Sequence, residues 1–427
     1  MVEQSSFSIG DVSLFKRKLL HWANQFTVFI CLDNNEASHL SSSLEFTVGV
    51  DKVRELSLTN EELQFKQLEE FQQTSSESIY GYLAYDLKNE LEQLHSKNPD
   101  YLEMPSTYFF EPRYTFHISD GSCTINRSTL ESIQLMDQIN SMVLTDSPEH
   151  TTVLKWKSRM TKEAYIQHLK TIKNNILEGT VYELNFCREL YAYTQSFNSL
   201  AAFLRINENA KAPFSAYLKM EDHHVLSFSP ERFMKHENGK IISQPIKGTL
   251  KKGNNYQENE KRKIALFNDE KERAENVMIV DLVRNDFAKS AIPGTVNVDE
   301  LFGVYEFENI IQMISTVSAH LKKDIHPLQA LKNAYPMGSM TGAPKVMAMN
   351  LIEEYEQVKR GVYSGALGYI KPDLTYDFNV LIRTLVFNQK KGYLSLQVGG
   401  AITYDAIPEK EWEETLVKAN SVLKYLG

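Results

Sequence analysis

A tight turn constrains the fold of this chain more than any other local feature. The sequence His-Glu-Asn-Gly at 236–239 separates two runs of β-forming residues, 225–233 and 240–245. Two-residue hairpin turns favour Asn-Gly, because both central residues need a positive φ. The two runs are therefore expected to pair as antiparallel strands.

Strand-like and helix-like patterns alternate along the rest of the chain, without an internal repeat. This mixture predicts an α+β fold and excludes solenoids and propellers, which need repeats. Further strands are predicted at 26–32, 114–118, 215–219, 365–370, 378–387 and 394–398. Helices are predicted at 88–95, 161–177, 256–289 and 408–426, and two helices around a Gly-rich elbow at 325–359.

The charge balance favours a small-molecule ligand over a nucleic acid. The 427 residues include 46 Lys and Arg against 55 Asp and Glu, which gives a formal net charge of -9, and there is no long basic run. No stretch reaches the roughly 20 apolar residues of a membrane span. We expect a soluble, cytoplasmic protein with no membrane contact. Three scattered cysteines, without metal, redox or disulfide spacing, agree with a reducing compartment: Cys31, Cys123 and Cys187.

A boundary is predicted near residue 150. Residues 142–150 contain Asp-Ser-Pro and form the best linker candidate, because such turn-forming residues interrupt helix and strand patterns. Residues 1–150 are expected to form an N-terminal part of the same fold with weaker motifs, and residues 151–427 to carry the chemistry.

The predicted hairpin brings a carboxyl group and an amine to one place. It folds Glu231 back beside 245–247, so Glu231 and Lys247 are candidates for acid–base or nucleophilic chemistry. Burial would lower the pKa of such a lysine towards neutrality. A solvated lysine in a surface salt bridge is the alternative, because a one-residue slip in register reverses the face that Lys247 takes.

Two acidic pairs with helical spacing form a second candidate site. Glu272 and Glu275, and likewise Glu411 and Glu414, lie three residues apart and share a helical face. Carboxylates from two helices suit Mg²⁺, which prefers oxygen ligands and keeps waters for a substrate carboxylate. A solvated charged face is the alternative. In the last helix, Glu411, Glu414 and Lys418 are expected to line a cleft beside a buried stripe of Trp412, Leu416, Ala419 and Leu423.

Three further segments suit anion binding. Residues 336–345 pack small residues before a helix, whose free N–H groups favour anions, although their order is not that of a P-loop and a plain helix-entry elbow is the alternative. Arg383 lies in an apolar run and needs a partner, either a substrate carboxylate or a structural Asp or Glu. Val-Gly-Gly-Ala-Ile at 398–402 ends another predicted strand.

Taken together and in this order, these segments resemble the chorismate-utilising enzymes, the family that includes anthranilate synthase component I and aminodeoxychorismate synthase component I. The resemblance covers roughly residues 155–427, with a more diffuse match at 81–90. It implies one large domain of the anthranilate synthase component I type, in which two antiparallel sheets pack face to face with helices outside and the site between them. The matching motifs are Ser-Pro-Glu-Arg-Phe, Pro-Ile-Lys-Gly-Thr, Glu-Asn-Val-Met-Ile-Val-Asp-Leu-Val-Arg-Asn-Asp, Gly-Ser-Met-Thr-Gly-Ala-Pro-Lys, Tyr-Ser-Gly-Ala-Leu-Gly-Tyr, Ile-Arg-Thr and Glu-Thr-Leu-Val-Lys-Ala.

Lys247 is the informative residue within this family. Anthranilate synthases usually carry Ala in the matching Pro-Ile-Ala-Gly-Thr, whereas aminodeoxychorismate synthases carry Lys. The resemblance implies that Lys247 attacks C2 of chorismate with loss of the C4 hydroxyl, that ammonia then adds at C4, and that the lysine leaves. The product would be 4-amino-4-deoxychorismate, on the route to 4-aminobenzoate and folate. Glu231 would protonate the departing hydroxyl and later act as a base.

The resemblance also implies the rest of the site. Glu275 and Glu414 would bind Mg²⁺ directly, Glu272 and Glu411 would stand in its outer shell, and the metal would hold the ring carboxylate of chorismate. The sequence contains no Gly-x-Cys-x-Gly elbow of a glutamine amidotransferase, so a separate glutamine amidotransferase subunit is implied as the source of ammonia. The enolpyruvyl carboxylate would be held by Tyr363, Arg383 and the backbone of Gly399, Gly400 and Ala401, with Lys418 and Ser339 nearby.

Three departures from the family pattern are present. Ala401 replaces a usual Gly, which requires a backbone without positive φ there. Gln312 replaces a His of many members, and the Leu-Leu-Glu-Ser signature of tryptophan-regulated members is absent, so tryptophan inhibition is not expected. The alternative functions are anthranilate synthase component I, isochorismate or salicylate synthase, and a non-catalytic chorismate-binding module.

Overall fold

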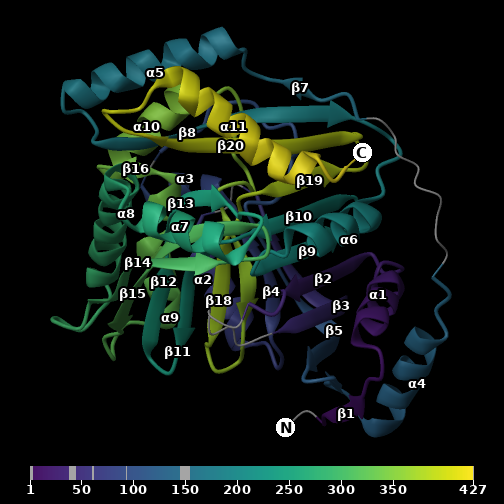
Figure 1. The fold of residues 1–427 in the computed structure, drawn as a ribbon. Coiled ribbons are helices and arrows are strands. Elements are labelled where there is room, and N and C mark those ends of the chain that lie inside the picture. Colours follow the sequence, from purple (N-terminus) through teal and green to yellow (C-terminus); the bar gives the residue numbers. More distant parts are fainter. Residues whose placement is uncertain (1–2, 38–44, 60–61, 93, 145–153, 427) are drawn as a thin grey trace.

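The computed structural model describes residues 3–37, 45–59, 62–92, 94–144 and 154–426. In this part of the chain, antiparallel pairing joins all strands into one hydrogen-bonded network of 20 strands (Figure 1). The network branches at two long strands, β3 (Phe46–Leu58) and β5 (Thr107–Ser119), which pair with each other along their length. Their register shifts between Lys52 and Arg54, and the strands on either side of this shift belong to two different sheets.

The first sheet continues from the N-terminal half of β3 and the C-terminal half of β5. Its order is β1, β6, β5, β3, β2, β9, β10, β19, β20 and β8, and short strands β7 and β16 add to β8. The bounds are β1 Ser5–Ser8, β2 Val28–Asp33, β6 Ser122–Ile125, β7 Lys157–Ser158, β8 Glu183–Tyr193, β9 Phe214–Met220, β10 His223–Ser229, β16 Gly342–Ala343, β19 Thr384–Asn388 and β20 Tyr393–Ile402.

The second sheet continues from the N-terminal half of β5. Its order is β5, β4, β17, β18, β11, β12 and β15, and β13 and β14 also pair with β15. Because β4 comes from the first quarter of the chain and β17 from the last, the N-terminal residues are built into the same domain. The bounds are β4 Ile79–Leu83, β11 Arg232–Glu237, β12 Lys240–Gln244, β13 Ile246–Lys251, β14 Asn297–Glu306, β15 Ile310–His320, β17 Ala366–Ile370 and β18 Tyr376–Val380.

Eleven α-helices lie in the described part of the chain. Seven of them begin at a polar residue whose side chain accepts a hydrogen bond from a backbone N–H of the first turn. Six of these residues are of the types that sequence rules place there: Asp11, Ser128, Thr161, Asn198, Asn255 and Asp269. The seventh is His326, before α9. The bounds are α1 Val12–Ala23, α2 Gln64–Gln73, α3 Lys88–Leu91, α4 Thr129–Asn140, α5 Lys162–Leu177, α6 Ser199–Ala210, α7 Tyr256–Phe267, α8 Glu270–Ala288, α9 Pro327–Ala334, α10 Lys345–Tyr355 and α11 Pro408–Leu423.

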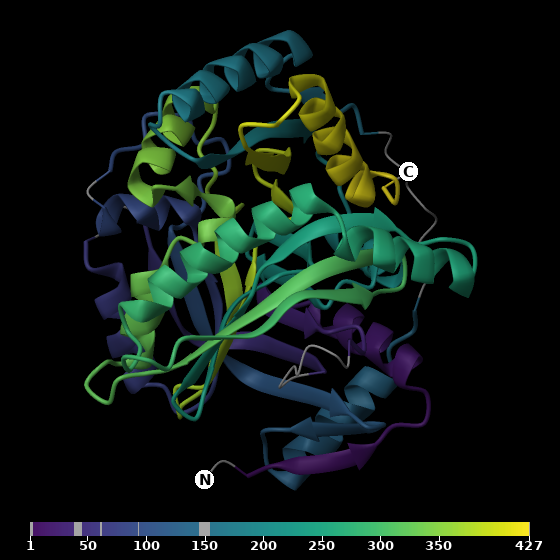
Figure 2. The ribbon, with the colours of Figure 1, turned by 60° about the vertical axis from the view of Figure 1, so that its left-hand side comes forward.

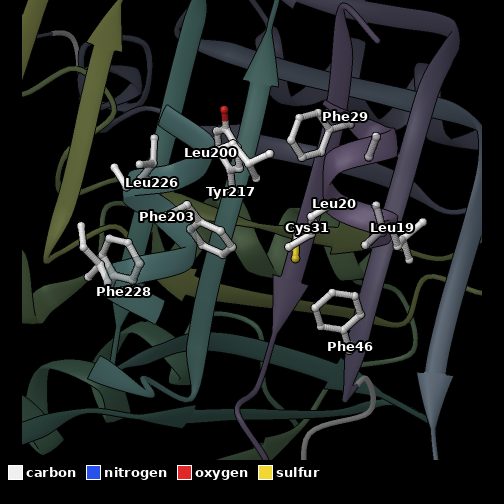
Figure 3. Close-up of a cluster of buried hydrophobic side chains, with 14 of the residues drawn as sticks. Leu19, Leu20, Phe29, Cys31, Phe46, Leu200, Phe203, Tyr217, Leu226 and Phe228 are labelled. Atoms are coloured by element: carbon white, nitrogen blue, oxygen red, sulfur yellow. The ribbon is translucent and has the colours of Figure 1, made fainter. Parts of the chain in front are cut away.

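Three apolar layers hold the sheets and helices together. One core lies between the sheets, because it combines side chains of β2, β9 and β10 with side chains of β4 and β17. A second core joins α1, α4, α6 and α11 to the other face of the first sheet. Figure 3 shows the part of this core that α1 and α6 form with the sheet. A third joins α2, α8 and α9 to the second sheet, so that helices lie outside both sheets (Figure 2). The predicted face-to-face sheets in one α+β domain are therefore confirmed.

The predicted hairpin is confirmed, and two other strand predictions are wrong in an informative way. Asn238 and Gly239 have φ values of 51° and 74° and connect β11 to β12. The strand predicted at 225–233 is two strands, β10 and β11, which are broken around Glu231. The strand predicted at 378–387 is likewise β18 and β19, broken where Arg383 has a φ of 53°. Both breaks fall on predicted site residues.

The other predicted elements are found with shifted ends. Helix α3 is shorter than the predicted 88–95, the helical stretch 256–289 is divided into α7 and α8, and the elbow at 325–359 separates α9 from α10. The predicted linker at 142–150 falls largely outside the described residues. The boundary near residue 150 therefore stays a prediction.

Two glycines face each other where β4 and β17 pair, and they test this packing. Gly81 lies opposite Gly368, and a Cβ atom on Gly368 would lie 2.0 Å from the carbonyl oxygen of Asp377. We predict that Gly368→Ala lowers the free energy of unfolding by about 3 kcal/mol, because backbone in two neighbouring strands must move apart. Urea unfolding followed by tryptophan fluorescence measures the loss. Gly10→Ala is the control, because nothing lies within 4 Å of its Cβ position, and equal midpoints for the two variants would contradict the prediction.

Candidate active site

Lys247 points into the protein. It lies on β13 opposite Met313 of β15, and its side chain is only 13% exposed. Its Nζ atom is 3.5 Å from Oε1 of Glu183 and 3.6 Å from Oε2 of Glu275. The alternative of a solvated surface lysine is therefore wrong.

Glu231 lies in the break between β10 and β11 and is buried. The Ser339 hydroxyl donates a hydrogen bond to its carboxylate, and Lys247 and Lys418 are close enough to act on its charge. Burial outweighs these three groups and raises the pKa of Glu231 to about 7. The predicted meeting of Glu231 and Lys247 in one site is confirmed, and the pKa suits a group that gives and takes protons near neutral pH.

The pKa of Lys247 moves in the opposite direction from the one expected. Burial acts to lower it, but the negative charges of Glu183 and Glu275 outweigh burial and raise the pKa of Lys247 above its ordinary value. The lysine is therefore held as an ammonium ion before substrate arrives. It must lose a proton before its nitrogen can act as a nucleophile.

The two predicted acidic pairs meet, although they lie on helices far apart in the sequence. Lys271 of α8 connects them, because its Nζ atom is 3.7 Å from both Glu275 of α8 and Glu411 of α11. On α11, Lys418 contacts Glu414 at 2.7 Å. Glu272 lies next to the Cα atom of Gly248, where a Cβ atom would be 3.2 Å from its Oε2 atom. The two helices thus face the β13 segment that carries Lys247.

The pKa values of these carboxylates are shifted by burial and by the charges of their neighbours. Burial and then the charge of Glu414 raise the pKa of Glu411 to about 7. Burial and then Glu275 raise the pKa of Glu272. Burial also acts to raise the pKa of Glu414, but Lys418 outweighs it, so this pKa is lowered. Four carboxylates of this kind are suitable ligands for a hard cation. In the described part of the chain, however, no three or more His, Cys, Asp or Glu side chains lie close enough together to hold a metal ion.

The buried stripe of α11 differs from the predicted one at two of its four members. Leu416 is 39% exposed and Leu423 is only partly buried, whereas Thr415 and Val422 are buried together with Trp412 and Ala419. The Thr415 hydroxyl accepts a hydrogen bond from the buried Arg188, which gives a polar residue a reason to face inward. This rotation also buries Glu411, of which only 5% is exposed.

The predicted Gly-Gly-Ala segment is part of strand β20 and borders the acidic cluster. A Cβ atom on Gly400 would lie 3.5 Å from Glu411 and 3.6 Å from both Glu414 and Lys418. The carbonyl oxygen of Gly399 accepts a hydrogen bond from Lys418 at 2.8 Å. Ala401 pairs with Asn185 in the strand and has no positive φ, as its side chain requires.

Tyr363 lies beside Cys187, and Arg383 is close enough to Tyr363 for their charges to interact. The Tyr363 hydroxyl is 3.6 Å from the Cys187 sulfur, and burial raises the pKa of Tyr363. Arg383 donates a hydrogen bond to the Ser421 hydroxyl at 3.1 Å. Among the described residues, no carboxylate lies within salt-bridge distance of Arg383, so the structural Asp or Glu considered as its partner is not found. Its guanidinium keeps donors for an external carboxylate.

Ser339 is held in the elbow between α9 and α10. Its carbonyl oxygen accepts a hydrogen bond from the Asn185 side chain at 3.0 Å. Lys345, the charged residue of this motif, does not face the site, because its Nζ atom binds Asp286 at 2.6 Å and the carbonyl oxygens of Ala334 and Pro336. In the segment 336–345, Ser339 therefore contacts Glu231 through a hydrogen bond. Lys345 instead connects the elbow to Asp286 of α8.

Two charged residues of the site were not predicted from the sequence. Glu183 is 1% exposed, contacts Lys247, and has one buried carboxylate oxygen without a hydrogen-bond partner among the described residues. The close approach of β16 to this residue depends on Gly342, where a Cβ atom would lie 2.2 Å from the Glu183 carbonyl oxygen. Lys271 is the other. Glu183 could have been noticed as a glutamate at the start of a strand that is buried on both faces. Nothing in the sequence distinguished Lys271 from its charged neighbours.

Gln312, one of the departures from the family pattern, lies beside β13, the strand that carries Lys247. It pairs with Thr249 of β13 and donates a hydrogen bond to its hydroxyl at 3.2 Å, while its amide oxygen is buried without a partner among the described residues. Its hydrogen bond to Thr249 does not connect it to any of the predicted site residues.

The geometry agrees with comparisons to known proteins. The chorismate binding enzyme family matches residues 22–424, and the chain therefore belongs to that family. Aminodeoxychorismate synthase component 1 of Escherichia coli is 38% identical over 309 residues, which cover 72% of this chain and 66% of that protein. The protein of the same name from Salmonella typhimurium is 40% identical over 63% of this chain and 58% of its own length. The matched segments thus span less than two thirds of these relatives.

A solved structure supports the fold independently. Anthranilate synthase component I from Streptococcus pneumoniae superimposes with a TM-score of 0.79 at 23% identity, over 88% of this chain and 91% of that one. The likeness confirms the expected fold type. No helix in the described part of the chain is long and apolar enough to cross a membrane.

The raised pKa of Glu231 makes stability depend on pH. Because the pKa is about 7 in the folded chain and near 4.5 when unfolded, the stabilisation is complete below about pH 4.5 and is lost as the pH rises through about 7. We predict that Glu231→Gln becomes more stable relative to the parent protein by roughly 3 kcal/mol between pH 5 and pH 8. Urea unfolding at both pH values measures this change. Glu208→Gln, at an exposed position, should show no such change, and parallel behaviour of both variants would refute the prediction.

Proposed function

We propose that this chain is an aminodeoxychorismate synthase component I, which converts chorismate and ammonia into 4-amino-4-deoxychorismate. The observation that carries the proposal is the buried Lys247 beside Glu231, at the position where the family's anthranilate synthases usually carry Ala. The names of the two bacterial relatives support it. An anthranilate, isochorismate or salicylate synthase has no use for a lysine nucleophile here, and a non-catalytic module has no use for Glu231 with a pKa of about 7.

In the first proposed step, Lys247 forms a bond to the substrate. Its ammonium group first gives a proton to Glu183, which lies 3.5 Å from Nζ and has a free carboxylate oxygen. The nitrogen electron pair then forms a bond to C2 of chorismate, the two conjugated ring double bonds shift, and the C4–O bond breaks. Glu231 delivers its proton to the departing hydroxyl, which leaves as water, since hydroxide is a poor leaving group.

In the second proposed step, ammonia takes the place of the hydroxyl. Its electron pair forms a bond to C4, the two ring double bonds shift back, and the C2–N bond breaks with its electrons returning to Lys247. The carboxylate of Glu231 accepts one proton from the new ammonium group and is thereby restored. Glu183 returns its proton to the Lys247 amine. Chorismate and ammonia give aminodeoxychorismate and water, and the enzyme ends as it began.

The remaining site residues are proposed to bind chorismate. Arg383 and Tyr363 bind the enolpyruvyl carboxylate together with the backbone of 399–401, and Lys418 and Ser339 lie beside it. The absence of a protein carboxylate at Arg383, among the described residues, supports this assignment. Lys418 also holds the Gly399 carbonyl oxygen, which fixes the strand against which the substrate would lie.

We also propose a Mg²⁺ site between α8 and α11. Glu275 and Glu414 would hold the ion directly and Glu272 and Glu411 through water. The raised pKa values of Glu272 and Glu411 support it, because carboxylates that repel one another gain from a cation between them. When bound, the ion supplies the positive charge that holds the ring carboxylate. Lys271, which now bridges the two helices, would have to yield its contacts with Glu275 and Glu411.

Ammonia is proposed to come from a partner. The relatives are named as component 1, which supports a second component, and we propose that it is a glutamine amidotransferase subunit. A cytoplasmic location and the absence of nucleic-acid and membrane partners belong to the same proposal.

The product of the reaction tests the proposal. With chorismate, Mg²⁺ and ammonium, the protein is expected to form aminodeoxychorismate, detected by chromatography after a lyase converts it to 4-aminobenzoate. Lys247→Ala should lose this product by at least about a hundredfold, because it lacks the nucleophile, and wild type incubated with chorismate alone should gain a covalent adduct at Lys247 by mass spectrometry.

Lys252→Ala is the matched control, because Lys252 lies just beyond the same strand and pairs with Glu306 outside the site. It should keep the parent activity. Anthranilate or isochorismate from the parent protein would refute the assignment and keep the family, and chorismate binding without turnover would favour the non-catalytic module.

Two adjacent glutamates of α11 test the metal site. Glu414→Gln is predicted to weaken Mg²⁺ binding by about tenfold or more, because it removes a charged ligand. Glu413→Gln should not, since Glu413 is exposed and pairs with Lys162. Calorimetric titration of Mg²⁺ in the presence of chorismate measures binding without turnover. Equal affinities in the two variants would place the metal elsewhere.

A further inference from the structure

A small cavity lies directly behind Glu231. It is lined by residues of the hairpin strands β11 and β12, of α8 and of the elbow after α9, and Glu231 and Ser339 belong to this lining. Apart from Ser339, none of the residues proposed to bind chorismate or Mg²⁺ lines it, and Lys247 does not. The cavity is therefore a different space from the region between α8 and α11.

The cavity has room for one molecule of the size of water. It measures about 10 Å³ in the space open to the centre of such a molecule, close to the least that a single buried water needs. Most of its wall is apolar, with Phe233, Val283, Phe287, Met337 and Val380 among its members. Hydrogen-bonding groups are few, and the carboxyl group of Glu231 and the hydroxyls of Ser339 and Ser243 are among them.

The other charged residues of the lining have partners. Asp286 lines the cavity, and its carboxylate binds Lys345 at 2.6 Å and the half-exposed Lys289 at 3.0 Å. Arg232, which also lines the cavity, is paired with Asp377 at 2.9 Å. The charges around the cavity are thus neutralised by partners, so the wall offers little to hold an ion.

We propose that this cavity is the ammonia site, from which ammonia reaches C4 of the substrate at Glu231. The inference rests on the proposed function, in which Glu231 accepts a proton from the incoming ammonia. The occupant is neutral ammonia, because an ammonium ion would lose its hydration in an apolar space while Glu231 still carries its proton and the other charges of the lining have partners. Glu231 gives its proton to the departing hydroxyl just before, so its charged carboxylate can then accept an N–H bond from the ammonia beside it.

Filling the cavity tests the proposal. Ala334 lines it from the end of α9, whereas Ala330 is buried on the same helix and does not line it. Ala334→Val should raise the KM for ammonia, expressed as the neutral form, by about tenfold, as one or two methyl groups do in a close-fitting site. The KM for chorismate, and the covalent Lys247 adduct formed without ammonia, should stay unchanged. Ala330→Val should alter none of these.

A second variant acts in the opposite direction. Val283→Ala enlarges the cavity from the α8 side and should leave the KM for ammonia equal to that of the parent or lower, even though it lowers stability. An unchanged ammonia KM in Ala334→Val, with parent-level product formation, would overturn the cavity assignment and leave the proposed function standing. Equal increases in the KM for ammonia and for chorismate would also overturn it. A parent protein that makes no aminodeoxychorismate would refute the proposed function itself.

Discussion

The site depends on charge compensation in a small, partly buried space. Six carboxylates face three lysines there: Glu183, Glu231, Glu272, Glu275, Glu411 and Glu414, with Lys247, Lys271 and Lys418. Ionising all of these carboxylates in a poorly solvated space is costly, and the pKa values of Glu231 and Glu411 are accordingly raised to about 7. A dianionic substrate adds further negative charge. The arrangement therefore calls for a cation as well as a protonated acid, and the proposed chemistry uses both.

The fold brings these charges together by placing five distant segments around one space, and the first residue of β8, Glu183, belongs to one of them. Strand β13 carries Lys247, the break after β10 carries Glu231, and α8 and α11 carry the acidic pairs. The two sheets share β3 and β5 and enclose a common core, so the hairpin of the second sheet and strand β20 of the first are fixed relative to each other. The Nζ atom of Lys247 lies 3.5 Å from a carboxylate oxygen of Glu183. A contact of this kind needs a rigid frame, because small displacements cost much of the catalytic advantage of positioning.

The family frame is shared by proteins with different reactions, as the likeness to an anthranilate synthase structure shows for the fold. Function within such a frame is decided by a few side chains. Here Lys247 is the side chain that separates the proposed reaction from that of anthranilate synthase, and Glu183 and the cavity behind Glu231 are features of this chain that fit the same reaction.

Sequence patterns alone predicted the hairpin, most of the strands and helices, and the residue types at the centre of the site. Asn238-Gly239 requires a tight antiparallel turn, and helical spacing puts Glu272 with Glu275 and Glu411 with Glu414. Both follow from local backbone geometry, which neighbouring residues determine. Tertiary structure decided which face Lys247 takes, the direction of its pKa shift, the bridging position of Lys271, the contact with Glu183 and the break at Arg383. These depend on pairing register and on burial beside residues far away in the chain, and neither quantity is encoded in a local pattern.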